Sequence, residues 1–513
     1  MTHWIILPIV LPAILAPFFI MVIRHHLDLQ RIFSVAGTLA LVAITLGLMG
    51  QASTGEIEVY ELGDWPAPFG IVLVLDRLSA LMIALTTVLA LAVLLYVIGT
   101  DWDKRGQHFH VLFQFQLMGL LGAFLTGDAF NLFVFFEVLL IASYGLMIHG
   151  GGGTRLRAGV QYVVYNLLGS TLFLFALGTL YAVTGTLNMA DLAERVAALP
   201  ADETALLRVG AVLLLLVFAI KAAVLPLHFW LPASYANAPL PVAALFAIMT
   251  KVGAYSIIRM DTLVFGPDVA ITHGLVGDWL LPAALLTLAA GTIGVLGSRD
   301  IARLVAFSAI GSMGTLLIAI SLFTPQATGA ALYYVIHSTL ATAMMFLVAD
   351  LIVERRKGTI SYAPPMPQSG LISTLFFIGA IALAGMPPLS GFIGKLLVMD
   401  AAWVVSQVWL IWGVILVTSL IVMIGFARAG SLIFWKSHDA ALAQALVEER
   451  KPPEPSDEGP PPVSALPFVA VFALLAGLVA LTVFAGPVTD YTAATAGQLF
   501  DRTDYIDAVL KRP

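Results

Sequence analysis

The chain has 513 residues, of which 60% are hydrophobic and only 11% are charged, and its mean hydropathy is +0.97. Soluble globular proteins carry about 25% charged residues, so this composition excludes a soluble chain and indicates a membrane protein. The chain has no cysteine, which excludes disulfides and iron–sulfur clusters bound through its own thiolates, and its net charge of −6 without a basic patch gives no indication of nucleic-acid binding.

Runs of about 20 apolar residues cross a bilayer as helices, and the sequence contains about fourteen of them. The first run, 4–23, has no basic residue before it and no small-residue cleavage site after it, so we expect a retained helix rather than a signal peptide. The polar break at 298–303 separates the ninth run from the tenth. The predicted spans lie near 4–23, 32–50, 72–98, 109–126, 129–149, 160–184, 207–230, 239–259, 275–297, 301–323, 327–352, 371–399, 404–434 and 463–486.

The Lys and Arg residues predict the orientation of these spans. If the loop at 24–31 lies in the cytoplasm and the loops alternate from there, the cytoplasmic loops contain 14 of the 25 basic residues and the outer loops contain six. The outer loop at 51–70 carries four acidic residues and no basic one. This bias follows the positive-inside rule and predicts a multi-pass protein of the cell (inner) membrane with both termini outside.

Proline interrupts two spans, in PLHFWLP at 226–232 and in GMPPLSG at 385–391. Proline removes a helical hydrogen bond, and the carbonyl that it frees needs a partner at membrane depth, often water in a cavity. Paired broken helices in corresponding halves of a chain indicate an ion path. The alternative is two ordinary proline kinks.

The C-terminal part differs from the rest in composition. The segment 437–462 reads as a short helix followed by an acidic, Pro-rich linker, and the polar segment 487–513 is expected outside the bilayer.

Four charged residues interrupt long apolar runs: Glu137, Lys221, Lys251 and Lys395. A charge at this depth costs about 2.5–3.5 kcal/mol on insertion scales, which indicates a functional role. Burial disfavours the charged form of lysine, so a buried lysine can release a proton near neutral pH, which arginine cannot do. The alternatives are a structural ion pair for Glu137 and, for the lysines and above all Lys251, a side chain that reaches the interface.

Two histidines extend this set. His337 lies near the middle of an unbroken span and is predicted to belong to a proton relay, with a packed core histidine as the alternative. His228 lies inside the first break and could line the same water path. We find no metal-ligand cluster and no hydrolase triad in the sequence, and no cofactor is predicted. The ligands of any transported Na⁺ stay unknown, because sodium needs several oxygen ligands and Glu137 alone is too few.

Three long motifs resemble the antiporter-like subunits shared by Mrp-type Na⁺/H⁺ antiporters and respiratory complex I: GDAFNLFVFFEVLLIASYGLM, FAIKAAVLPLHFWLPASYANAPLPVAALFAIMTKVGAY and GMPPLSGFIGKLLV. The resemblance covers roughly 70–435 and is greatest to the D-type subunits of Mrp antiporters. It implies an all-α polytopic membrane protein of about 14 transmembrane helices, with two inverted five-helix repeats and broken helices 7 and 12. By this resemblance, the proton-translocating residues are Glu137, Lys221, Lys251, His337 and Lys395.

The implied organisation places helices 1–3 in 1–108, the first inverted repeat (helices 4–8) in 109–260 and the second (helices 9–13) in 261–435. A cytoplasmic linker, helix 14 and an outward tail follow in 436–513. The expected function is proton translocation in a multi-subunit Na⁺/proton antiporter, with other hydrophobic subunits as partners. The alternatives are a proton-pumping subunit of a redox enzyme, such as complex I or a membrane-bound hydrogenase, and a plain solute transporter with a midplane substrate site.

Overall fold

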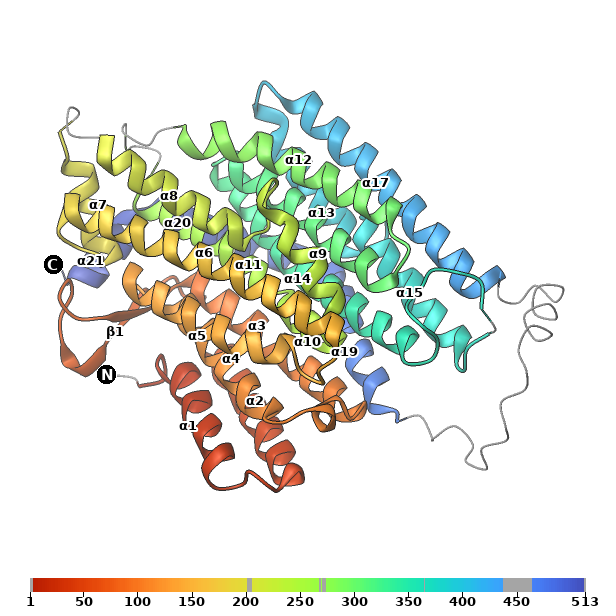
Figure 1. The fold of residues 1–513 in the computed structure, drawn as a ribbon. Coiled ribbons are helices and arrows are strands. Elements are labelled where there is room, and N and C mark those ends of the chain that lie inside the picture. Colours follow the sequence, from red (N-terminus) through yellow and green to blue (C-terminus); the bar gives the residue numbers. More distant parts are fainter. Residues whose placement is uncertain are drawn as a thin grey trace.

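A computed structural model describes residues 3–200, 205–266, 269, 274–363, 365–436 and 464–511, and in this part the chain is predominantly helical (Figure 1). Ten of the described helical segments are long and apolar enough to cross a membrane, and three shorter apolar helices, α1, α4 and α15, accompany them. This agrees with a polytopic membrane protein. The predicted linker 437–462 lies outside the described residues.

The helices follow the predicted spans closely. Those of the N-terminal half are α1 Leu7–Met21, α2 Leu27–Ala52, α3 Arg77–Gly99, α4 Phe109–Leu125, α5 Ala129–Met147, α6 Gly153–Thr184, α7 Met189–Ala198, α8 Ala205–Lys221, α9 Trp230–Asn237, α10 Leu240–Phe246 and α11 Met249–Leu263. Those of the C-terminal half are α12 Leu275–Gly297, α13 Ile301–Ser321, α14 Pro325–Val353, α15 Ser369–Ala384, α16 Ser390–Ala401, α17 Val408–Gly430, α19 Leu466–Val483, α20 Ala485–Phe500 and α21 Arg502–Leu510.

The third span begins later than predicted, and a short β-hairpin precedes it. Val72–Leu75, predicted as the start of the third span, is strand β2, which pairs antiparallel with β1 (Glu58–Glu61). The helix begins only after Asp76, whose carboxylate accepts from the Ser79 main-chain N–H while the Ser79 hydroxyl accepts from that of Asp76. This reciprocal capping box fixes the start of α3. Hydropathy alone does not distinguish a short buried strand from the first turn of an apolar helix.

The loops gather at two opposite ends of the helical bundle. The loops at 101–108, 148–155, 298–303 and 353–361 meet at one end, called here the basic end, where Arg105 pairs with Glu354 and Arg155 donates to the carbonyl of Asn237. The hairpin β1–β2, both described chain ends and α20–α21 lie at the other end, called here the hairpin end (Figure 1). The two termini therefore lie on one side, as the alternation of loops predicts.

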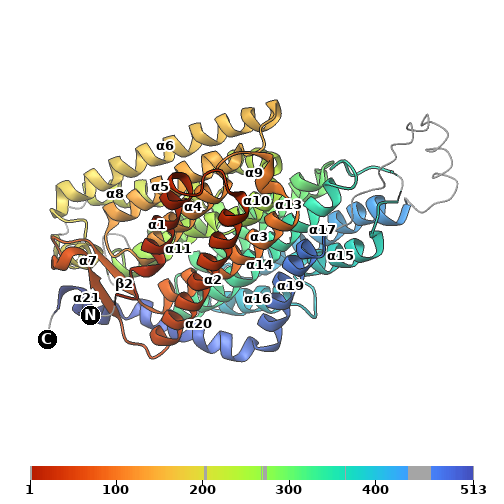
Figure 2. The same cartoon turned by 90° about the horizontal axis from the view of Figure 1, so that it is seen from below.

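The C-terminal tail is folded rather than extended. Figure 2 shows α20 along the lower edge of the bundle, with α21 beside the end of the chain. Tyr491 donates to the Arg77 carbonyl and Gln498 to that of Gly55, each at 2.9 Å, and Thr495 is fully buried. The segment 487–513 was predicted from its polarity to lie outside the bilayer. Hydrogen bonds of its polar side chains fix it to the start of α3 and to the loop before β1, contacts that composition could not show.

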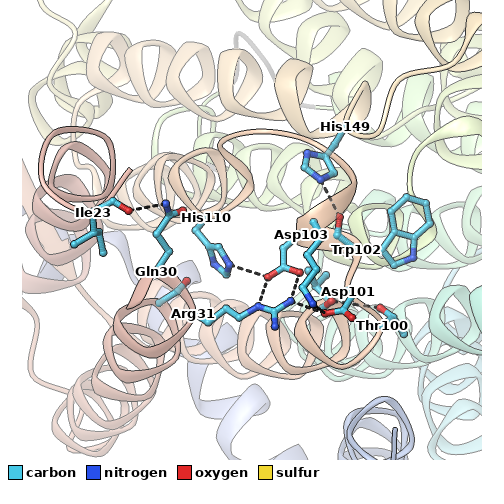
Figure 3. A network of polar contacts seen from close by, with 12 residues as sticks. Ile23, Gln30, Arg31, Thr100, Asp101, Trp102, Asp103, His110 and His149 are labelled. Carbon is cyan, nitrogen blue, oxygen red and sulfur yellow. Dashed lines mark hydrogen bonds and ion pairs between the residues drawn. The ribbon is translucent and has the colours of Figure 1, made fainter. Parts of the chain in front are cut away.

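A polar network joins α2, the loop after α3 and α4 at the basic end (Figure 3). Arg31 donates two hydrogen bonds to Asp103, both at 2.6 Å, and one to Asp101 at 2.7 Å, while His110 Nε2 lies 3.2 Å from Asp103. Burial alone would raise the pKa of Asp103, but the hydrogen bonds from His110 and Arg31 and the Arg31 charge lower it to about 2. The carboxylate thus stays ionised and fixes α2 against α4.

Candidate functional site

Glu137 lies midway along α5 and is partly buried. Its carboxylate accepts a hydrogen bond from the Ser170 hydroxyl on α6. On the same face of α5, Val134 and Ile141 are 38% and 63% exposed, so the carboxylate lies toward the outer surface of the bundle. A carboxylate at this depth needs a donor, and Ser170 is the one that the described residues supply.

Lys221 is the last residue of α8 and is 6% exposed. Its ammonium donates to Asn166 Oδ1 on α6 at 3.0 Å and lies 5.7 Å from the centre of the Phe136 ring. Asn166 and Ser170 are one helical turn apart, so a single face of α6 contacts both Lys221 and Glu137. Within the described residues the structure shows no ion pair of Lys221 with a carboxylate. Ser170 and Asn166 of α6 therefore connect Glu137 with Lys221 without a direct ion pair, and the two residues remain within electrostatic range.

The first break begins directly after Lys221, before the proline at which it was predicted. Ala223 adopts a left-handed conformation with φ 54°, which is unfavourable for alanine and stops the helix. The Ile220 carbonyl accepts from the Ala223 N–H at 3.1 Å and from Trp230 Nε1 at 3.0 Å, and the Leu225 N–H donates to Thr287 Oγ1 on α12 at 2.8 Å. The predicted interruption is confirmed, and protein side chains bond main-chain groups on both sides of it.

Lys251 lies in the first turn of α11 and is 1% exposed. In the part of the chain that the structure describes, no side-chain hydrogen bond to its ammonium is found. Two turn residues just before it, at 247–248, keep a helical backbone between α10 and α11, so these helices form the single apolar segment Leu240–Leu263, in agreement with the predicted eighth span. Gly253 permits close packing here, because a Cβ at this position would lie 2.7 Å from the Phe218 carbonyl oxygen on α8. The end of α8 that carries Lys221 thus packs directly on the start of α11.

His337 lies in the middle of α14 and is 1% exposed. Its Nδ1 is 2.9 Å from the Ser390 hydroxyl, the first residue of α16 after the second break. A Cβ on Gly391 would lie 2.8 Å from His337 Nε2 and would overlap the Ala382 carbonyl oxygen, so glycine lets these groups approach. His337 is within range of the charges of both Lys395 and Lys251, which places it between them electrostatically.

Lys395 lies on α16 and is 7% exposed. Its ammonium donates to the main-chain carbonyl of Ala384, the last residue of α15, at 2.9 Å and to Ser419 Oγ on α17 at 2.8 Å. Gly385 follows in a left-handed conformation, and a Cβ there would lie 2.6 Å from Lys395 Cδ. The second break is therefore confirmed at 385–389, and the lysine satisfies the carbonyl that this break frees.

His228 is not brought to this set. It lies in the short turn Leu227–Phe229, partly buried, with its ring 4.8 Å from that of Phe229. Across the described ranges its Nδ1 is buried without a hydrogen-bond partner. The same ranges contain no group of three or more His, Asp or Glu side chains that could hold a metal ion.

The structure thus arranges the five predicted residues in two groups, one around α6 with Glu137 and Lys221 and one around α14 with Lys251, His337 and Lys395. Sequence reasoning missed the polar residues that contact them. The Asn166 and Ser170 pair has a readable signal, since two polar residues four apart on an apolar helix share one face. Ser390 and Ser419 carry no such signal in the sequence, because a single serine in a membrane span most often hydrogen-bonds the backbone of its own helix.

The whole chain is similar to proteins of one family. The family model described as NADH:quinone oxidoreductase/Mrp antiporter, transmembrane, matches residues 126–422. The D-type subunit of a probable K⁺/H⁺ antiporter of Rhizobium meliloti is 40% identical, covering 100% of this chain and 98% of its own, and the D-type subunit of the Na⁺/H⁺ antiporter of Bacillus subtilis is 39% identical with full coverage of both. A chain in the structure of the Mrp complex from Dietzia superposes with a TM-score of 0.87 at 28% identity, covering 99% of this chain and 100% of that one.

Proposed function

Since the chain belongs to the antiporter-like family of NADH:quinone oxidoreductase and the Mrp antiporters, and matches its D-type antiporter subunits over its whole length, we propose that it translocates protons within a multi-subunit monovalent cation/proton antiporter. One observation carries the proposal. The three lysines of its membrane spans are buried, and none forms an ion pair with a carboxylate within the described residues. Fixed structural charges would be paired, whereas unpaired buried lysines suit groups that gain and lose protons.

We propose fourteen membrane spans. The ten long and three shorter apolar helices give thirteen, and α8, which ends at the first break, gives one more. We further propose an N-terminal unit at 1–108, two inverted five-helix repeats at 109–260 and 261–435, and a C-terminal unit at 436–513. The two breaks support the repeats: in each, a lysine lies beside the interruption, in the helix before the first and in the helix after the second.

In this proposal the proton passes along a row parallel to the membrane. Loss or gain of a proton in the group of Lys251, His337 and Lys395 changes the field at Lys221. That change alters the strength of the hydrogen bond from Lys221 to Asn166. Because Ser170 lies on the same face of α6, the hydrogen bond from Ser170 to Glu137 changes with it. One elementary charge is worth about 2.3 kcal/mol per 100 mV, so a cycle that moves charge responds to the membrane potential.

The remaining expectations complete the proposal. The protein works in the cell membrane beside other hydrophobic subunits, with the basic end in the cytoplasm and both termini outside. The transported ions are H⁺ and a monovalent cation, for which we propose Na⁺. Relatives named for K⁺ and for Na⁺ resemble the chain about equally, so direct comparison of the two cations is part of the test. The cation path itself is proposed to lie in another subunit or at a subunit interface.

The second candidate is a proton-pumping subunit of a redox enzyme, because the family includes NADH:quinone oxidoreductase. Purification of the intact complex separates the two. Small hydrophobic antiporter subunits support the antiporter, and quinone-linked iron–sulfur subunits support the redox enzyme.

Everted membrane vesicles that contain the whole complex test the activity. Addition of Na⁺ or K⁺ should discharge an imposed pH gradient, and Glu137→Ala or Lys221→Ala should abolish this response while the complex still assembles on a native gel. Wild-type exchange by an assembled Lys221→Ala complex would refute the proposal. Lys221→Arg should also fail, because arginine stays charged; normal exchange by this variant would make Lys221 a fixed charge.

A further inference from the structure

A cavity of about 470 Å³ opens at the basic end, between the loops that follow α3, α5, α9 and α14. Its wall includes both charged and small residues: Trp102, Arg105, Gly151, Gly152, Arg155, Asn237, Asp300, Asp350 and Glu354. One of these differs from the others. Asp350 lies in α14, the helix that carries His337, and it is 1% exposed. It forms the inner wall of a cavity that reaches the solvent.

The direct partners of Asp350 are neutral. Its carboxylate accepts from the Tyr96 hydroxyl at 2.9 Å and from Trp102 Nε1 at 3.0 Å. Trp102 is itself fixed, because its main-chain carbonyl lies 3.0 Å from His149 Nε2 (Figure 3). Neutral donors orient a carboxylate without supplying the positive charge that would hold it permanently ionised.

The cations near Asp350 are bonded elsewhere. Arg105 stacks on the Trp102 ring at 3.9 Å and pairs with Glu354 at 2.6 Å. Arg155 donates to the carbonyls of Asn237, His149 and Gly151, and Arg355 to that of Leu351 and to the side chain of Gln368. These three arginines and Glu354 are the charged groups whose fields reach Asp350. Their bonds leave Asp350 as a buried carboxylate free to bind a proton from the cavity.

A stripe of residues leads from Asp350 into the membrane along α14. Ser338, Thr342, Phe346 and Asp350 are spaced by four residues and share one helix face. The hydroxyls of Ser338 and Thr342 are fully buried, and within the described residues neither has a hydrogen-bond partner. Buried hydroxyls are almost always paired, with water where the protein offers no partner. The stripe therefore indicates ordered water beside His337.

An aromatic contact lies on this face of α14, between Thr342 and Asp350. The Phe346 ring meets that of Tyr235, with centroids 6.1 Å apart, and the Tyr235 hydroxyl donates to the Phe246 carbonyl at 2.8 Å. The rise of the helix puts Asp350 about 12 Å from Thr342 along the axis, a few water lengths. Along this face of α14 the aromatic contact therefore lies between Asp350 and the hydroxyls of Thr342 and Ser338.

We propose that Asp350 is the proton-accepting site at the basic end, from which the proton reaches Lys251 and His337 along the Thr342 and Ser338 stripe. The carboxylate takes one proton from the water of the cavity and later gives that proton to the water of the stripe; an O–H bond forms and the same bond breaks. This inference rests on the proposed proton translocation and adds its entrance.

Everted vesicles containing the whole complex give the first test. Asp350→Asn keeps the shape and one acceptor but cannot carry a proton, so cation-dependent proton movement should fall by about a hundredfold, the lower end of what a positioned proton-transfer group contributes. Asp350→Glu should restore a part. Asp300→Asn removes the charge of another carboxylate of the same cavity and keeps an oxygen that can accept from the Ala302 and Arg303 N–H groups, so it is the matched control and should stay near wild type. Wild-type exchange by an assembled Asp350→Asn complex overturns the proposal.

Two isosteric substitutions on α14 test the proposed proton route even if the Asp350→Asn complex fails to assemble. Thr342→Val removes an unpaired hydroxyl of the stripe and should slow proton movement. Thr339→Val removes an equally buried hydroxyl that bonds its own helix, at the Val335 carbonyl, and should not. Equal rates in the two variants overturn the route.

Infrared difference spectra between acidic and alkaline buffers separate failure of this inference from failure of the proposed function, because they report carboxyl protonation without any cation exchange. The wild type should show a band of a protonated carboxyl group that is lost in Asp350→Asn and shifted in Asp350→Glu. Either change supports proton uptake at this residue, even in a complex that exchanges no cation. Spectra of Asp350→Asn or Asp350→Glu that match the wild type overturn it. The proposed function would instead be refuted if the wild-type complex showed no cation/proton exchange and the Lys221→Ala complex behaved in the same way.

Discussion

The Lys395 ammonium donates a hydrogen bond to the main-chain carbonyl of Ala384 at 2.9 Å. Ala384 ends α15, and its carbonyl is one that the break at 385–389 leaves without a helical partner. The side chain and the broken backbone therefore satisfy each other. A change in the charge of Lys395 alters the bond at the break, and through Ser419 it also alters the contact with α17.

Removal of Lys395 should impair transport more than its replacement by another titratable group. Lys395→Ala removes the proton site and both hydrogen bonds, so we expect cation-dependent proton movement in vesicles to fall by about a hundredfold or more. Lys395→Glu should keep partial activity, because a carboxyl can also bind and release a proton. If both variants fail to assemble on a native gel, Lys395 pairs with a neighbouring subunit instead. Full transport by Lys395→Ala would reduce it to a side chain that reaches the interface.

The α6 bridge predicts a role for two residues without charge. Ser170→Ala removes the hydroxyl that donates to Glu137, and a hydrogen bond to a charged group is worth about 1.5–3 kcal/mol, so proton movement should fall by about tenfold or more. Asn166→Leu, which removes the acceptor of Lys221, should act similarly. Thr171→Val is the matched control, because that exposed hydroxyl bonds its own helix at the Leu167 carbonyl. Equal transport by Ser170→Ala and Thr171→Val would exclude the bridge.

Close packing at the second break predicts that Gly391 does not accept a larger residue. A Cβ there would overlap the Ala382 carbonyl oxygen and approach His337 Nε2 to 2.8 Å. Gly391→Ala should therefore displace His337 and reduce vesicle transport, with overpacking costs of about 1–3 kcal/mol in the thermal stability of the complex. Gly370→Ala on α15, where nothing lies within 4 Å of the new methyl group, should change neither property. Wild-type transport by Gly391→Ala would show that His337 tolerates displacement.

Sequence reasoning predicted the helices and the buried charges because both have strong local signals. Long apolar runs predict spans, and Lys221, Lys251 and Lys395 stand out by the cost of placing them there. It did not predict which groups these residues contact. The bond from Lys395 to Ala384 and the bridge through Asn166 depend on how helices distant in sequence pack, which hydropathy does not encode. The hairpin at 58–75 was missed for a different reason: β2 reads VLVL and resembles the beginning of an apolar helix, and β1 reads EVYE and lies in a segment interpreted as an acidic loop.

The network around Asp103 predicts an acid-sensitive stability that does not involve the proton row. Because the folded-state pKa of Asp103 lies below its ordinary value, at about 2, its contribution is present above about pH 4 and is lost as the pH falls toward 2. The shift corresponds to about 2 kcal/mol. Asp103→Asn should lower the melting temperature at pH 6, and the difference from wild type should shrink toward pH 3. Asp101→Asn is the control, because Asp101 bonds the same Arg31 but its side chain is 54% exposed. A difference that does not depend on pH would contradict this assignment.

Cysteine labelling should place the two ends of the bundle on opposite sides of the membrane. The chain has no cysteine of its own, so a single introduced thiol is an unambiguous reporter. Thr54 is exposed at the hairpin end, and Ser361 is exposed at the basic end, where most of the Lys and Arg residues gather. Because the positive-inside rule assigns the basic end to the cytoplasm, a membrane-impermeant thiol reagent should label Thr54→Cys in intact cells and Ser361→Cys in everted vesicles. The same experiment fixes both termini, which lie at the hairpin end with Thr54. Labelling of Ser361→Cys in intact cells would reverse the orientation and would move the Asp350 cavity to the outer side, so that it would serve proton release rather than uptake.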